Sequence, residues 1–268
     1  MSEPEQPDSN ETDKALEQQY WQAVVRAKTD TSAVESLLSQ SPELVHSRFR
    51  GLAWGPDRWR DSKPEKPTEP PQDFLFTNSA IHVAAVNGYD NLLSVLLEAD
   101  ADPNDIGYED NKGLTPPIVL AAWEGSINTV RILLEYGADP NLAASAETAL
   151  YTAAEHGSRD KVDLLLEFGA QLDVFTAAII GDAESVAAML YAYPSLSDRR
   201  SLKRNRTPAE EARHHKQDAV LALFDEQFLE DARSPYGKIS HVAGKQNVST
   251  ITFNFVLKSG FYLSLIHI

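Results

Sequence analysis

Hydrophobic residues recur along this chain in three similar segments, and each segment predicts a pair of short antiparallel helices. Every segment holds two adjacent alanines, then a glycine, then an apolar stripe of valine and leucine that ends in glutamate. The alanine pairs begin at Ala84, Ala121 and Ala153, so the segments are spaced by 37 and 32 residues. Apolar residues at helical spacing give each helix one face for a core, and small alanines let neighbouring helices approach closely. The pattern therefore predicts stacked helix pairs.

Three weaker copies extend this pattern. One lies at residues 20–38, before the strong segments, and two lie after them, at 175–190 and 207–224. The alanine pair of the second copy begins at Ala177, only 24 residues after Ala153, which leaves too little chain for a full β-hairpin. We therefore expect an irregular connection there, whereas the longer interval between the first two strong segments predicts an enlarged loop at 105–112. The count is about six units, three of them strong.

The strong segments closely resemble the ankyrin repeat, a unit of about 33 residues with a β-turn and two helices. The resemblance is carried by the alanine pair, by the Leu-Leu-Glu run, and by the Ala-Asp-Pro-Asn sequence found at 101–104 and 138–141. It implies an all-α solenoid over residues 14–231, in which helix-turn-helix units carry short β-hairpin fingers. It also implies that His82 is structural, with its ring bonded to backbone in the turn between repeats.

Glycines mark the expected helix ends, where a left-handed backbone conformation favours this residue. At the ends of the first helices these are Gly88, Gly125, Gly157 and Gly181. At the ends of the second helices they are Gly137 and Gly169, and Asp100 takes that position in the first strong repeat.

Amino-acid composition indicates in which cellular compartment the protein works and which kind of partner it binds. The hydrophobic fraction of 42% can fill a substantial core, yet no apolar run approaches the roughly 20 residues of a membrane span. The chain has no cysteine, and residues 1–13 do not resemble a signal peptide, so we expect the cytoplasm, or the nucleus if the source is a eukaryote. A net charge of −16 disfavours nucleic acids and anionic membranes and favours a basic protein segment as partner.

No catalytic pattern emerges from the chemistry-bearing residues. The sequence has no glycine-rich phosphate loop, no Gly-x-Ser-x-Gly and no His-Glu-x-x-His. His214 and His215 are adjacent on a predicted helix, about 100° apart, and so cannot point at one metal by themselves. The glutamates at Glu98, Glu135 and Glu167 occupy outward positions. We expect no enzyme activity, no cofactor and no metal.

The ankyrin resemblance implies that partner contacts come from finger tips and from the exposed ends of the first helices, which line a concave groove. Carried onto this chain, those positions are Leu75, Phe76, Asn78, Val86, Asn87, Asn111, Lys112, Leu114, Trp123, Glu124, Ala144, Ser145, Glu147, Glu155, His156, Ile179 and Ile180. Trp123 beside Glu124 and Glu155 would suit an arginine or lysine through cation–π contact and charge pairing. The alternative is that the indole packs on the neighbouring helix.

Four segments have their own composition. Residues 1–13 are acidic and contain two prolines, which predicts a disordered leader. Residues 50–73 hold five prolines with Trp54 and Trp59, so this long loop either folds back on the first repeats or forms a flap over a ligand. The basic run at 199–206 is the expected finger of the fifth repeat; it is a solvated loop, a nuclear-import-like patch or a dock for an acidic peptide.

The fourth segment, residues 232–268, contains no aspartate or glutamate. Its last six residues, 263–268, resemble a translation of the transposon end used to build sequencing libraries, so we expect a non-native end. A native β-hairpin is the alternative, with Ile251, Phe253, Phe255 and Leu257 on one face and a turn at 258–260.

Two function classes follow from these patterns. The first is a monomeric, non-catalytic scaffold that binds a partner protein through the concave groove. The second is a regulatory or targeting portion of a larger enzyme or effector whose catalytic domain lies outside this sequence.

Overall fold

The computed structural model describes residues 9–49, 78–109, 113–143 and 147–224. The proline-rich loop at 50–73 with its two tryptophans, and the tail at 232–268, lie outside these residues. The chain divides into two compact units, Met1–Leu172 and Asp173–Ile268. The boundary falls in the short connection after the third strong repeat, where the spacing leaves no room for a finger.

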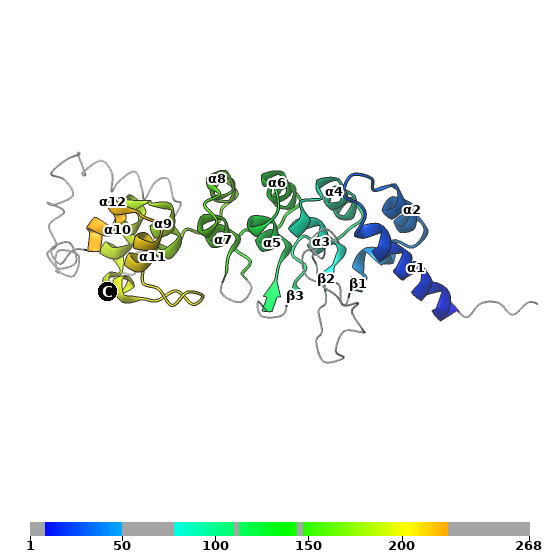
Figure 1. Ribbon diagram of the computed structural model, residues 1–268, viewed down its shortest axis with the longest axis horizontal. Helices are drawn as coiled ribbons and strands as arrows, with labels where there is room; N and C mark the ends of the chain where they lie inside the picture. The colour runs from blue at the N-terminus through cyan, green and yellow to red at the C-terminus, as the bar shows by residue number, and fades with distance from the viewer. Residues whose placement is uncertain (1–8, 50–77, 110–112, 144–146, 225–268) are drawn as a thin grey trace, which may run out of the picture. The chain divides into compact units, whose positions relative to one another are not determined.

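Six successive helix pairs make up the described residues (Figure 1). The first unit holds α1 (Ser9–Val24), α2 (Ser32–Gln40), α3 (Ala80–Asn87), α4 (Asp90–Glu98), α5 (Pro117–Trp123), α6 (Ile127–Glu135), α7 (Ala149–Glu155) and α8 (Arg159–Glu167). The second holds α9 (Val174–Ile180), α10 (Ala183–Ala192), α11 (Pro208–His214) and α12 (Asp218–Leu221). The predicted pairs, including the three weak ones, are confirmed.

The start of α1 corrects one boundary. The sequence predicts a disordered leader over residues 1–13, but the helix already begins at Ser9. Residues 9–13 therefore belong to this helix and not to a disordered leader. Residues 1–8 lie outside the described part of the chain.

The core of the first unit is built by the alanine pairs. Helix α3 packs on α5, and α5 packs on α7, while α4, α6 and α8 form a second row. The paired alanines on these inner helices are buried, as are the leucines that face them, such as Leu96, Leu133 and Leu165. Glu98, Glu135 and Glu167 are exposed, as the helical period predicts.

Gly125 serves a different purpose from the one that the pattern predicts. The glycines at 88, 157, 181, 137 and 169, and also Asp100, do adopt positive φ, but Gly125 does not. A side chain at Gly125 would instead place its Cβ 2.7 Å from the carbonyl oxygen of Ala85 and 2.9 Å from that of Ala121. Glycine is required here because two neighbouring repeats approach each other too closely for any Cβ.

Two asparagines join successive repeats through backbone groups. Asn104 donates to the carbonyl of Gly137 (3.1 Å) and accepts from the amide of Asp139 (2.8 Å). Asn141 repeats the arrangement one unit later, with the carbonyl of Gly169 (3.1 Å) and the amide of Gln171 (2.7 Å). The recurrent Asp-Pro-Asn sequence therefore satisfies backbone groups at the helix end of the next repeat.

Short strands form the fingers of the first unit. Strand β1 (Arg48–Phe49) pairs antiparallel with β2 (Asn78–Ser79), and β3 (Gly107–Glu109) pairs antiparallel with β4 (Gly113–Thr115). The loop predicted at 105–112 therefore contributes strand β3, at 107–109, to a finger.

His82 links the start of α3 to the second of these fingers. The amide of Gly107 donates to His82 Nε2 at 2.8 Å, and the amide of Ser79 donates to Nδ1 at 3.3 Å. His82 Nδ1 also lies 3.0 Å from Ser79 Oγ. Ser79 Oγ in turn donates to Asp105 Oδ2 at 2.5 Å, and Arg48 pairs with the other oxygen of Asp105. The imidazole is fully buried, and the structural role predicted for His82 is confirmed.

The second unit is smaller and repeats the same packing. Helix α9 packs on α11, and Gln217 Nε2 donates to the carbonyl of Ile179 at 2.8 Å. A short 3₁₀ helix, η3 (Pro194–Asp198), precedes the basic run, which leads into α11. The run is therefore the finger between the fifth and sixth helix pairs of the described residues, counted from α1.

Leu133→Ala is expected to cost about 2–5 kcal/mol of unfolding free energy, because Leu133 is fully buried in the most regular repeat. Urea unfolding followed by circular dichroism measures the loss. Ile127→Ala, in the same helix but 40% exposed, is the matched control and should cost about 1 kcal/mol or less. Equal losses at the two sites would contradict the packing.

His82 should make the first unit sensitive to mild acid. Burial lowers the pKa of His82 from its ordinary 6.5 to about 4, against the opposing attraction of Asp105. The unfolded chain therefore takes up this proton first as pH falls. Stability that is complete above about pH 6.5 is lost between pH 6.5 and 4, by on the order of 3 kcal/mol.

The measurement is unfolding free energy against pH for the wild type and for His82→Gln, which should remove this part of the slope. The titration of Asp105 does not contribute to the difference between these two pH profiles. Burial alone would raise the pKa of its carboxyl, but the Ser79 hydrogen bond and the neighbouring charges bring that pKa below 3.8, outside the window. Parallel profiles for the two proteins would contradict the assignment.

Candidate functional site

The ends of the first helices of two adjacent repeats meet at an aromatic pair. Trp123 is the last residue of α5, and His156 directly follows α7. Their ring centroids are 6.3 Å apart, with the planes inclined at 50°. His156 is exposed and its Nδ1 donates to the carbonyl of Thr152 (2.8 Å), whereas Trp123 is half-buried. The sequence prediction placed both residues at contact positions, and the structure brings them together.

Two carboxylates flank this pair. Glu124 follows Trp123 and is exposed, and Glu155 ends α7 and is half-buried. We call Trp123, Glu124, Glu155 and His156 the Trp123 surface. The Trp123 side chain is only partly exposed, so both interpretations of it stay open.

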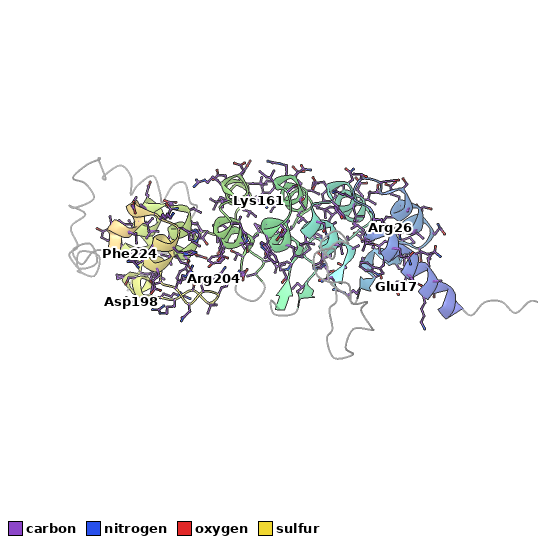
Figure 2. The ribbon with its side chains drawn as sticks, in the orientation of Figure 1. Glu17, Arg26, Lys161, Asp198, Arg204 and Phe224 are labelled. Carbon is purple, nitrogen blue, oxygen red and sulfur yellow. The ribbon has the colours of Figure 1, made fainter. Side chains whose placement is uncertain are left out.

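A cation that the sequence analysis missed lies next to this surface. Lys161 on α8 donates through Nζ to the carbonyls of Ala121 (3.2 Å) and Ala122 (3.1 Å) on α5 (Figure 2). These are orphan carbonyls at the C-terminal end of a helix, where the helix dipole favours a positive charge. Burial lowers the pKa of Lys161, and the negative charge of Glu124 opposes that shift. No local signal could have identified this contact, because its partners lie about forty residues earlier in the chain.

Three predicted contact residues are buried instead of exposed. Asn78 and Val86 are 3% exposed and Ile179 is 2% exposed, which corrects the expectation that they line an accessible surface. Val86 and Ile179 occupy the position of Trp123 in their own repeats, but these smaller aliphatic side chains are enclosed by the helices around them. Asn78 lies in β2, where its Oδ1 would lie 2.2 Å from a Cβ at Gly107.

The remaining predicted positions are more open or lie outside the described residues. Asn87 is half-buried and donates to the carbonyl of Val83 at 2.8 Å, and Glu147 and Ile180 are also half-buried. Leu114 contributes its backbone to β4. The residues that the structure does not describe are Leu75, Phe76, Asn111, Lys112, Ala144 and Ser145.

A hydroxyl, an imidazole and a carboxylate do come together elsewhere, at Ser79, His82 and Asp105. Their order differs from that of a nucleophilic triad, because the serine hydroxyl donates to the carboxylate and not to the imidazole. The second ring nitrogen of His82 accepts the Gly107 amide and cannot accept a further proton from a substrate in this arrangement. The geometry fits a buried structural network.

A small cavity of about 210 Å³ borders this network. It is lined by Val45, His46, Arg48, Ser79, Ile81, Ala101, Asp102 and Asp105. Pockets for small molecules usually measure about 300–1,000 Å³, so this one is below that range.

Neither a metal site nor a membrane span is found in the described part of the chain. No group of three or more histidine, aspartate or glutamate side chains there could hold a metal ion, and His214 and His215 contact each other edge-on with ring centroids 5.0 Å apart. No helix among the described residues is long and apolar enough to cross a bilayer.

Comparison with known proteins gives one clear result. The family model for ankyrin repeats in three copies matches residues 22–144 and 81–176, which together span more than half of the 268 residues. No curated protein matches the chain. Ankyrin repeats are generally protein–protein interaction modules. The matched segments include α2 to α8 with their alanine packing and the Asp-Pro-Asn ties. The chain belongs to the ankyrin repeat family.

Proposed function

We propose that this chain is a non-catalytic scaffold that holds a partner protein on the Trp123 surface. The observation that carries the proposal is the Trp123–His156 pair, which places partly exposed aromatic rings from two adjacent repeats 6.3 Å apart. Aromatic side chains of this kind dominate the binding energy of many protein interfaces, because they bury a large area at a small entropic cost. The helix-end position is also where members of this family contact their partners.

The charges around the indole favour a basic segment of the partner. An arginine or lysine laid over the ring would gain a cation–π interaction and would lie near the carboxylates of Glu124 and Glu155. The net charge of −16 adds a long-range attraction that speeds the encounter with a basic protein.

Lys161 sets a limit on this attraction. Its ammonium is held on the carbonyls of Ala121 and Ala122 and lies close enough to Glu124 for their charges to interact. The positive charge of Lys161 therefore weakens the attraction between Glu124 and a basic partner. The indole becomes correspondingly more important for recognition.

Trp123→Ala is expected to weaken binding by about 1–3 kcal/mol without unfolding the chain. The partner is first identified by capture on the intact chain. Isothermal titration calorimetry with that purified partner then measures the affinity of each variant. Tyr136→Ala is the matched control, since Tyr136 is a 43% exposed aromatic residue at the end of α6 and lies outside the Trp123 surface. Equal losses in the two variants would contradict the assignment.

Charge reversal at Glu124 and Glu155 should mainly slow association, and the effect should be largest at low salt. Stopped-flow or surface-plasmon kinetics at two salt concentrations measure the association and dissociation rate constants separately. Glu135→Lys, at an exposed position on α6, should have little effect. Lys161→Gln changes the charge in the opposite direction and should speed association. The site assignment would be wrong if the reversals were silent.

A further inference from the structure

One loop of the second unit is strongly basic, although the chain as a whole is acidic. Residues 199–206 include Arg199, Arg200, Lys203, Arg204 and Arg206 and no acidic residue, within a chain of net charge −16. We call this loop the basic finger. It lies between η3 and α11, and Figure 1 shows it as a turn that projects beyond the helices of its unit.

The basic finger has a defined backbone. The amide of Ser201 donates to the carbonyl of Arg206 at 2.8 Å, and the amide of Asn205 donates to the carbonyl of Ser201 at 3.0 Å. Asn205 adopts a left-handed conformation with φ of 53°, which asparagine tolerates better than most residues. These bonds close the turn and fix the direction in which its tip points.

Two arginines and two glutamates anchor the base of the basic finger. Arg200 donates to Glu210 at 3.0 Å, and Arg206 donates to Glu211 at 3.3 Å. Glu211 is 1% exposed and also lies 3.4 Å from the hydroxyl of Ser201. A buried carboxylate needs such partners, so these contacts hold the finger on α11.

The other basic residues of the finger are accessible to solvent. Arg199, Lys203 and Arg204 are exposed, and Figure 2 shows Arg204 on the projecting part of the loop. Between them lies Leu202, which is 87% exposed. Leu202 therefore offers an accessible apolar contact among the cations of the basic finger.

We propose that the basic finger binds an acidic segment of a partner protein, in which carboxylates flank an apolar side chain. The exposed cations would pair with the carboxylates, and Leu202 would contact the apolar side chain. This site is independent of the Trp123 surface, which lies in the other unit and has the opposite charge.

The exposed Leu202 favours a protein segment over nucleic acid, because an apolar side chain has no complementary group on a phosphate backbone. Each exposed ion pair contributes little by itself. Several cations on a preorganised turn, joined by an apolar contact, lose less entropy on binding.

The experiment begins with selection from a random peptide library on phage, using the intact chain as bait. The expected peptides are rich in aspartate and glutamate and contain an apolar residue. Fluorescence anisotropy with a selected synthetic peptide then gives the affinity. The double variant Lys203→Gln/Arg204→Gln should bind about tenfold more weakly or worse. Leu202→Ser should also weaken binding severalfold.

The matched control is Arg213→Gln/Lys216→Gln, which removes one arginine and one lysine from exposed positions of the same unit outside the finger. This control variant should bind the peptide within about twofold of the wild type. Trp123→Ala should do the same, so a failure of the basic-finger proposal can be distinguished from a failure of the Trp123-surface proposal. The proposal is overturned if the selected peptides are not acidic, or if both double variants bind alike. It is also overturned if a single-stranded RNA binds the finger more tightly than the peptide does.

Discussion

The close approach of stacked first helices is the constraint on which the rest of the first unit depends. The buried alanine pairs permit it, and at Gly125 even a single Cβ would collide with the backbone of the preceding repeat. Because the helices lie so near to each other, their C-terminal ends also come together. Trp123 and His156 meet for this reason, although they belong to different repeats and lie far apart in sequence.

Such tight stacking leaves backbone groups at helix ends that need hydrogen-bond partners, and the neighbouring repeat supplies them. Asn104 and Asn141 each bond a carbonyl and an amide of the next repeat, and Lys161 bonds two carbonyls of the previous one. Each repeat therefore completes the polar contacts of its neighbour as well as its hydrophobic core. This explains why such units are stable in a stack and marginal alone.

The two units offer surfaces of opposite charge built by different means. In the first, aromatic and acidic side chains gather at helix ends because the helices stack. In the second, cations are presented on a turn whose base is anchored by Glu210 and Glu211. Each surface repels a segment of its own charge, so the two surfaces favour segments of opposite charge.

The sequence by itself determined the helix pairs, their approximate period and the buried leucines, because helical periodicity depends only on residues three or four positions apart. It also placed the left-handed turns at 88, 157 and 181 and the structural role of His82. Only the tertiary structure decided that Gly125 is needed for close packing, that Lys161 lies beside Glu124, and that Val86 and Ile179 are enclosed while Trp123 is not. Those outcomes depend on atoms contributed by other repeats, tens of residues away, and no local pattern records which of them will meet.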